Sequence, residues 1–111
     1  MNKRQLGNTN INLTAIGFGG APLGNLFENL DERNCYDILE KTYNEGINIY
    51  DTSPLYGYGL SEHRLGNFLK TVDEESYFLS TKVGRYLTPA KKESIDRGRF
   101  VGSLNFSPNL D

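Results

Sequence analysis

The chain has 111 residues, enough for one ordinary domain with a modest core and too few for two. Hydrophobic residues make up 37% of it, which is typical of a globular protein and not of a disordered tail. The 12 basic and 14 acidic residues give a formal charge of -2. Because no stretch gathers Lys and Arg with aromatic residues between them, we expect no nucleic-acid-binding surface.

The single cysteine and the first residues indicate where the protein works. Cys35 is the only cysteine, which excludes an internal disulfide framework and fits a reducing compartment. It lies in a helical pattern, so a packed thiol is favoured over a reactive one. The basic start, residues 1–5, has no apolar stretch behind it and does not resemble a signal peptide. With no membrane-spanning run, a soluble cytoplasmic protein is expected.

In chain order, the first predicted element is a β-hairpin over residues 3–14, with a Gly-Asn turn between two short extended arms. The next segment, residues 15–24, has the sequence Ala-Ile-Gly-Phe-Gly-Gly-Ala-Pro-Leu-Gly. It predicts a short apolar strand that gives way to glycines. Glycines at a strand end indicate a place where something approaches the backbone closely.

A helix is predicted after Asp31, which is a suitable N-cap residue. The residues that recur at helical spacing in it are Cys35, Ile38, Leu39, Thr42 and Tyr43. Gly46 is expected to end this helix at the C′ position. A short strand over residues 47–50 follows at once and ends on Asp51.

A loop rich in Pro, Gly and Tyr runs to Gly59, and Ser61 is expected to cap a second helix. The apolar stripe of that helix consists of Leu65, Phe68 and Leu69. Residues 77–83 predict the third strand. Alternation of strands and helices is typical of βαβ units with a parallel sheet, so the fold class is α/β. Residues 84–111 have little periodicity and predict a long irregular loop that is functional or disordered.

Three polar residues are predicted to meet at one edge of this sheet. Asp51 ends the second strand, Tyr56 lies in its loop, and Lys82 ends the third strand. Ligands of parallel α/β folds bind at the carboxyl ends of the strands. A tyrosine has an unperturbed pKa of about 10, and a neighbouring Lys cation favours its phenolate, while a buried Asp can hold the Lys. Such a group donates a proton to a carbonyl oxygen or accepts one from an alcohol.

The same residues have ordinary structural interpretations. The run Asp-Thr-Ser-Pro over residues 51–54 is compatible with a simple turn. Tyrosines are common in this region, and a Lys at a strand end is usually only solvated. Spacing alone therefore leaves the proton-transfer interpretation open.

The residues around these positions match the motif of a known family. The run Tyr-Asp-Thr-Ser-Pro-Leu-Tyr-Gly at residues 50–57, followed by Ser-Glu at 61–62 and Leu-Gly at 65–66, closely resembles the signature of the aldo-keto reductase family. The run Leu-Ser-Thr-Lys-Val-Gly-Arg at 79–85 is similar to the catalytic-lysine strand of that family. The hairpin at 6–9 and the glycine segment at 17–24 resemble its first segments, in the same order.

This resemblance implies a partial (β/α)8 TIM barrel, in which an N-terminal β-hairpin is followed by a βαβαβ segment. It implies that Asp51, Tyr56 and Lys82 are catalytic, with Tyr56 as the general acid/base. The residues beside the nicotinamide half of the cofactor, NADP or NAD, would be Gly19, Gly20, Ala21 and Asp51. The cofactor would give or take the hydride, and the protein would supply orientation and the proton.

Within the family, the motifs resemble most the branch of sugar 1-dehydrogenases and pyridoxal dehydrogenases. This implies a small carbonyl or sugar substrate, either an aldose such as fucose or galactose, or pyridoxal. His63, the only histidine, is expected on the surface of the second helix and does not match the catalytic His of the family. No His, Cys and Asp residues have the spacing of metal ligands.

A complete (β/α)8 barrel needs about 250 residues, so residues 1–111 are expected to be an incomplete N-terminal portion, inactive alone. The remainder of the barrel, in the same or a second chain, would supply the catalytic His and most of the cofactor site. A fragment of a longer gene product is favoured over a complete truncated protein. Two non-enzymatic hypotheses stay open, namely an interaction module completed by a partner chain and a nucleotide-binding or sensory subunit.

Overall fold

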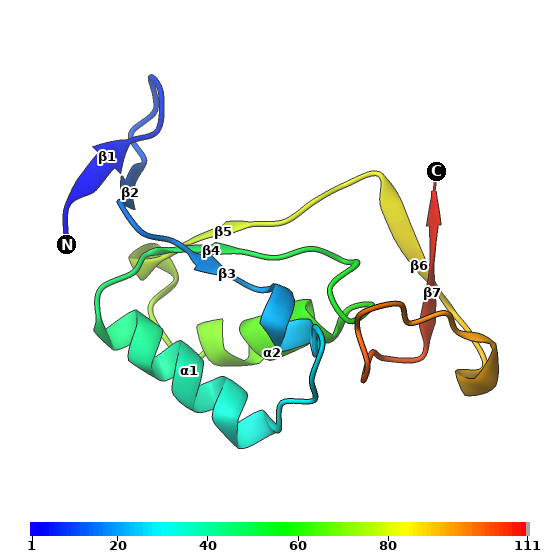
Figure 1. Ribbon diagram of the computed structural model, residues 1–111. Coiled ribbons are helices and arrows are strands. Elements are labelled where there is room, and N and C mark those ends of the chain that lie inside the picture. Colours follow the sequence, from blue (N-terminus) through cyan, green and yellow to red (C-terminus); the bar gives the residue numbers. More distant parts are fainter. Residues whose placement is uncertain (111) are drawn as a thin grey trace.

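A small β-hairpin opens the chain in the computed structural model, which describes residues 1–110 (Figure 1). Strand β1 (Lys3–Gln5) pairs antiparallel with β2 (Asn12–Thr14), as predicted. The side chain of Asn48 connects the hairpin to the sheet, since its Oδ1 accepts a hydrogen bond from the Thr14 N–H at 2.8 Å. The hairpin therefore has a fixed attachment next to the start of the second parallel strand.

Three short parallel strands form the sheet, in the order β3 (Phe18–Gly19), β4 (Ile49–Asp51) and β5 (Phe78–Ser80). Each strand lies where the sequence predicts one, and each is shorter than predicted. In Figure 1 the two α-helices lie on one side of this sheet. The arrangement is the βαβαβ segment that the sequence pattern predicts.

Helix α1 (Glu32–Asn44) begins and ends as predicted. The Asp31 carboxylate accepts a hydrogen bond from the Asn34 N–H at 2.7 Å, which satisfies a free donor of the first turn. Gly46 follows the C-cap residue with a φ of 92°. The apolar stripe is narrower than expected, because Cys35 and Leu39 are buried while Ile38 is exposed.

The predicted N-cap of the second helix is wrong. Helix α2 (Leu60–Leu69) begins two residues earlier, with Gly59 at the N-cap position and a φ of 99°. Ser61 lies inside the first turn and is fully buried. It shares a helix face with Leu65 and Phe68, four and seven residues later, so its hydroxyl points into the molecule instead of toward the helix end.

The core lies between the helices and the sheet. Tyr50, in the middle of β4, is completely buried and packs against Phe18 of β3, with ring centroids 5.8 Å apart. The other buried members of this cluster are Leu23, Cys35, Leu39, Leu65, Phe68 and Leu69. The core therefore holds both helices against the middle strand, whose carboxyl end carries Asp51.

The long irregular loop predicted after the third strand is also wrong in part. Strand β6 (Arg85–Pro89) pairs antiparallel with β7 (Phe106–Leu110), and both project from the end of the sheet beyond α2 (Figure 1). The connection between them contains a single short 3-10 turn, η3 (Lys92–Ser94). The last residue, Asp111, lies outside the described residues.

Two other short 3-10 turns complete the fold, η1 (Ala21–Gly24) after β3 and η2 (Glu74–Ser76) before β5. Within residues 1–110, no helix has both the length and the apolar character needed to cross a membrane.

Candidate active site

The carboxyl ends of the three parallel strands bring the predicted site residues together. Gly19 on β3 lies opposite Asp51 on β4, and Asp51 lies opposite Ser80 on β5. In a parallel sheet, neighbouring residues in register point to the same face. Asp51 therefore has the exposed backbone of Gly19 on one side and the Ser80 side chain on the other.

Asp51 and Lys82 form an ion pair at this edge. Lys82 Nζ lies 3.0 Å from Asp51 Oδ2 and donates a second hydrogen bond to the Thr52 carbonyl at 2.8 Å. The Ser80 hydroxyl donates to Asp51 Oδ1 at 2.9 Å. The sequence predicts a buried carboxylate here, but both side chains are half-exposed, at 43% for Asp51 and 48% for Lys82.

The charges of this pair are mutually stabilised. Partial burial raises the pKa of Asp51. The hydrogen bonds from Lys82 and Ser80 and the charge of Lys82 lower this pKa by more than burial raises it, so the net shift is downward. The hydrogen bond to Asp51 is the main cause that raises the pKa of Lys82 above its ordinary value, and Tyr56 adds to it. Lys82 is therefore a cation, and Asp51 an anion, across the neutral pH range.

Tyr56 lies in the loop after β4, with its ring beside Lys82. Lys82 Nζ is 5.0 Å from the Tyr56 ring centroid, within the range of a cation–π contact. The loop is held by short-range hydrogen bonds from the Tyr56 N–H to the Ser53 carbonyl and from the Ser61 N–H to the Tyr56 carbonyl, both 3.1 Å. All three predicted catalytic residues thus meet at one place, with Lys82 between the other two.

Two buried hydroxyls connect the strand ends behind this site. Ser61 Oγ donates to the Gly20 carbonyl at 2.7 Å and lies 2.8 Å from Thr52 Oγ1. A hydroxyl has one proton, and that of Ser61 goes to Gly20, so Thr52 donates to Ser61. The same Thr52 supplies the carbonyl that accepts from Lys82. The first turn of α2 is therefore linked to both the glycine segment and the lysine.

The residues predicted to lie beside a nicotinamide differ in their surroundings. Gly19 is exposed, with no other atom within 4 Å of where a Cβ would be. Gly20 is buried, and a Cβ there would lie 2.8 Å from both the Asp51 carbonyl and Ser61 Oγ, so a larger residue does not fit. Ala21 is half-buried and begins η1. The backbone of Gly19 is therefore open to a ligand, and the close packing around Gly20 fixes the position of this segment.

A groove of about 370 Å³ opens beside Tyr56 and Lys82. Its other lining residues are Ser53, Pro54, Leu55, Val83 and Arg85. The lining thus combines an apolar wall with hydroxyl and cationic groups and includes no carboxylate. Such a surface suits a small polar molecule with an apolar part.

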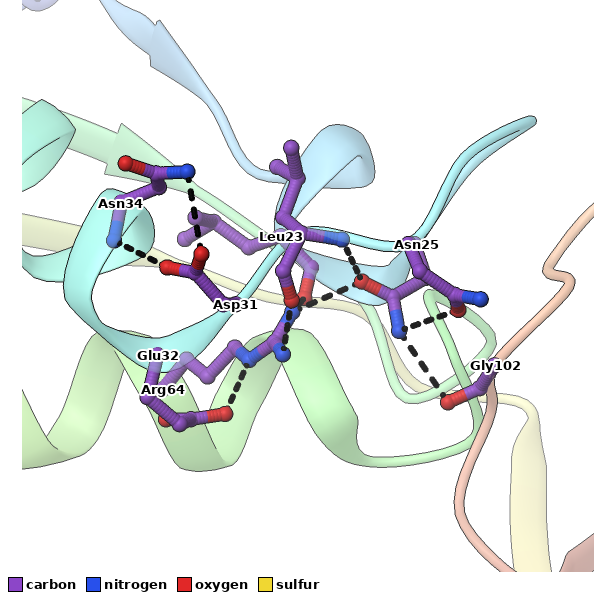
Figure 2. Close-up of polar contacts among 9 residues, drawn as sticks. Leu23, Asn25, Asp31, Glu32, Asn34, Arg64 and Gly102 are labelled. Atoms are coloured by element: carbon purple, nitrogen blue, oxygen red, sulfur yellow. Dashed lines mark hydrogen bonds and ion pairs between the residues drawn. The ribbon is translucent and has the colours of Figure 1, made fainter.

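The buried guanidinium of Arg64 was not predicted from the sequence. Its side chain is 6% exposed and donates to the Leu23 and Leu30 carbonyls and to Asn25 Oδ1, at 2.7–2.9 Å, and pairs with Glu32 at 2.7 Å (Figure 2). A signal was present, because Arg64 is four residues from both Leu60 and Phe68 and so occupies the apolar face of α2. Arg64 joins α2 to the segment between β3 and α1.

His63 and Cys35 lie in the surroundings that the sequence predicts. His63 is exposed on α2. Cys35 is a buried free thiol, and burial is the main reason that its pKa is raised, so it is a poor nucleophile at neutral pH. In the part of the chain that the structure describes, no group of His, Cys, Asp and Glu residues is arranged to hold a metal ion.

Comparison with known proteins shows which family the chain matches. The sequence model of the Aldo/keto reductase family matches residues 15–107. The chain is 47% identical over 77 residues to a D-threo-aldose 1-dehydrogenase from Pseudomonas sp., a match that covers 69% of the chain and 23% of the relative. It is 43% identical over 119 residues to a pyridoxal 4-dehydrogenase from Microbacterium luteolum, which covers 98% of the chain and 34% of that relative. The chain thus spans about a quarter to a third of the length of these relatives.

Solved structures give the same result for the fold. An aldo-keto reductase from Bacillus halodurans, in a holo form, matches with a TM-score of 0.67 and 34% identity over 85% of the chain and 28% of that protein. A glycerol dehydrogenase from Gluconobacter oxydans matches with a TM-score of 0.68 over 98% of the chain and 30% of its own length. At 20% identity, the second match concerns the fold alone. The predicted α/β fold, a partial (β/α)8 barrel, is confirmed.

Proposed function

The chain belongs to the aldo/keto reductase family, and on that premise we propose that it is the N-terminal portion of a nicotinamide-dependent oxidoreductase. The proposed reaction transfers a hydride between NADP or NAD and an aldehyde or sugar, of the aldose or pyridoxal type. These substrates are suggested by the names of the relatives. The rest of the barrel, in the same or a second chain, is required, and a reducing cytoplasmic location fits the free Cys35.

The position of Lys82 is the observation that carries this proposal. Its ammonium group contacts the Asp51 carboxylate on one side and lies over the Tyr56 ring on the other. A cation beside a phenol stabilises the negative charge that the oxygen carries after it gives up its proton. Asp51 and the Thr52 carbonyl hold the ammonium in place, so Tyr56 is suited to donate or accept a proton at its Oη atom.

The residues at the strand ends fit a bound nicotinamide. Gly19 leaves open space beside Asp51, and Gly20 is locked by hydrogen bonds to the Asp51 carbonyl and from Ser61. Gly19, Gly20, Ala21 and Asp51 would hold that half of the cofactor. When bound, the cofactor supplies the hydride or accepts it. The protein residues orient the two reactants and move the proton.

The groove next to Tyr56 is the proposed place for the substrate. Pro54, Leu55 and Val83 give it an apolar wall, while the Tyr56 hydroxyl and the Ser53 side chain provide polar partners. A carbonyl or hydroxyl carbon bound here would be near the proton donor and near the strand ends. This placement is consistent with an aldose or a pyridoxal-like ring.

The phenol oxygen of Tyr56 provides the direct test of this function. We expect Tyr56→Phe, made in the protein that carries this chain, to reduce turnover of pyridoxal or L-fucose by about 10²–10⁴-fold, the usual contribution of a positioned acid or base. Binding of NADPH, measured by fluorescence titration, should stay unchanged, because the ring and its contact with Lys82 remain.

Tyr36→Phe is the matched control and should retain normal turnover, because it keeps the half-exposed ring of α1 that packs against Phe68 and removes only the hydroxyl. Full activity of Tyr56→Phe would exclude the proposed role. The alternative, an interaction module completed by a partner chain, is favoured by the uncovered edges of β3 and β5 and by the absence of a closed barrel among residues 1–110. That alternative predicts stable association with another chain and no turnover in the assembled complex.

A further inference from the structure

We propose that Phe100 is a positioning residue for Tyr56, held in place by a buried network that begins at Arg64. This inference rests on the proposed function, since it assigns Phe100 a part in aligning the proton donor. The Phe100 and Tyr56 ring centroids are 6.0 Å apart, with an angle of 34° between the planes. Among residues 1–110, Phe100 is the aromatic side chain that packs against the Tyr56 ring. It is half-buried and does not line the groove.

The backbone on both sides of Phe100 is fixed to the segment before α1. The Val101 N–H donates to the Asn25 carbonyl at 3.1 Å, and the Phe27 N–H donates to the Arg99 carbonyl at 2.8 Å. Leu26 and Phe100 thus form an antiparallel β-bridge. The ring position is therefore set by the path of the backbone, and not only by side-chain packing.

Asn25 carries this attachment into the interior. Its Nδ2 donates to the Gly102 carbonyl at 3.2 Å, and its Oδ1 accepts from Arg64 at 2.9 Å (Figure 2). Asn25 is 5% exposed and adopts a left-handed backbone conformation with a φ of 63°. Such a conformation favours Asn or Gly, so few residues could replace it here.

The connection is also attached on the side of Tyr56 itself. The Leu104 N–H donates to the Gly57 carbonyl at 2.9 Å, next to Tyr56 in the chain. The segment from Arg99 to Leu104 is thus bound to the loop before α1 and to the loop that carries Tyr56. Phe100 lies between these attachments and supports one side of the Tyr56 ring.

This arrangement has a defined consequence for the proton donor. Lys82 and Phe100 both contact the Tyr56 ring, the first as a cation and the second as an apolar support. Loss of the support would let the phenol move and admit water beside it. A displacement of about 1 Å in a catalytic group can lower the rate by 10²-fold.

The test is Phe100→Ala in the protein that carries this chain, with Val101→Ala as the control. Val101 is 48% exposed and is bound to Asn25 only through its backbone, so its side chain should not matter. We expect Phe100→Ala to lower kcat by at least about tenfold and to change the pH profile of kcat, with the Kd for NADPH unchanged. Phe100→Tyr keeps the ring and should restore most of the rate. Phe100→Leu keeps much of the apolar volume but removes the aromatic ring, and it replaces the alanine variant in the same measurements if that variant does not fold.

Hydrogen exchange gives a readout that does not need activity. We expect exchange of the amides at residues 55–59 to become faster in Phe100→Ala but not in Val101→Ala, while the amides of β4 keep their protection. If Phe100→Ala matches Val101→Ala in both exchange and kcat, the inference is overturned even where Tyr56→Phe is inactive. If exchange at residues 55–59 changes but Tyr56→Phe remains active, Phe100 positions the loop and the proposed function fails.

Discussion

At the scale of single residues, the Asp51–Lys82 pair contributes geometry more than stability. Both side chains are half-exposed, and ion pairs of this kind contribute about 0–1 kcal/mol. Their hydrogen bonds, however, hold the ammonium group over the Tyr56 ring. The pair therefore matters more for the position of the Lys82 ammonium group than for the stability of the fold.

This difference predicts the behaviour of Asp51→Asn. We expect the free energy of unfolding, measured by urea titration near pH 7, to fall by less than about 1 kcal/mol, while turnover falls by more than about tenfold. Ser80→Ala is the comparison variant, since it removes the other hydrogen bond to Asp51 without removing a charge. A loss of several kcal/mol in Asp51→Asn would show that the carboxylate is structural.

The pH dependence of that stability difference follows from the two pKa shifts. The pKa of Asp51 is lowered from 3.8, so its contribution is full above that value and is lost as the pH falls through the lower folded pKa. The pKa of Lys82 is raised from 10.5, so its contribution is full below that value and is lost as the pH rises through the higher folded pKa. The difference between the wild type and Asp51→Asn should thus be constant from about pH 5 to pH 9.

The sequence predicts which residues lie together at the strand ends, but not the residues that hold them there. Asp51, Tyr56 and Lys82 follow predicted strands, and parallel strands bring their carboxyl ends to one edge. The partners of Ser61 are 9 and 41 residues away in the chain, so no local pattern indicates them. Ser is a good N-cap residue, and that local preference gave the wrong role for a hydroxyl used in tertiary contacts.

At the scale of elements, Arg64 is the main polar link between α2 and the segment before α1. Its guanidinium is buried and satisfies two backbone carbonyls as well as Asn25. Its ion-pair partner Glu32 is 72% exposed, so water can replace that contact. The hydrogen bonds to the carbonyls therefore matter more than the ion pair.

Arg64→Met and Glu32→Gln separate these two contributions. We expect Arg64→Met to lower the free energy of unfolding by about 3 kcal/mol, because the Leu23 and Leu30 carbonyls lose a charged donor inside the protein. Glu32→Gln should cost less than about 1 kcal/mol. Urea titrations of both variants provide the measurement. Equal losses would mean that the ion pair, and not the carbonyl contacts, stabilises this junction.

The paired strands β6 and β7 show what local patterns cannot predict. Each contains a proline, and 16 residues without periodicity separate them, so neither segment looks like a strand by itself. The segment between them is held by contacts with distant residues, including the hydrogen bond from the Leu104 N–H to the Gly57 carbonyl. The helices α1 and α2 were predictable because their apolar residues recur locally.

At the scale of the whole molecule, the two helices cover one face of the sheet and leave the other open (Figure 1). Tyr50 points into the core, so its neighbour Ile49 points to the opposite face, together with Phe78, its partner in register. Both are only half-buried. The outer strand β5 carries Leu79, which is 53% exposed, and Val83 beyond it is fully exposed. These surfaces require a covering that residues 1–110 do not supply.

A polypeptide limited to residues 1–111 should therefore self-associate and be inactive. An uncovered edge strand with exposed apolar side chains favours pairing with another chain. We expect light scattering after size exclusion to give masses above 12.5 kDa, and no NADP-dependent turnover of pyridoxal or L-fucose. Leu79→Lys should reduce the association, because it places a charge on the exposed edge, whereas Lys70→Arg at the exposed C-cap of α2 should leave it unchanged. A monomer with measurable turnover would contradict both the exposed-surface argument and the need for the rest of the barrel.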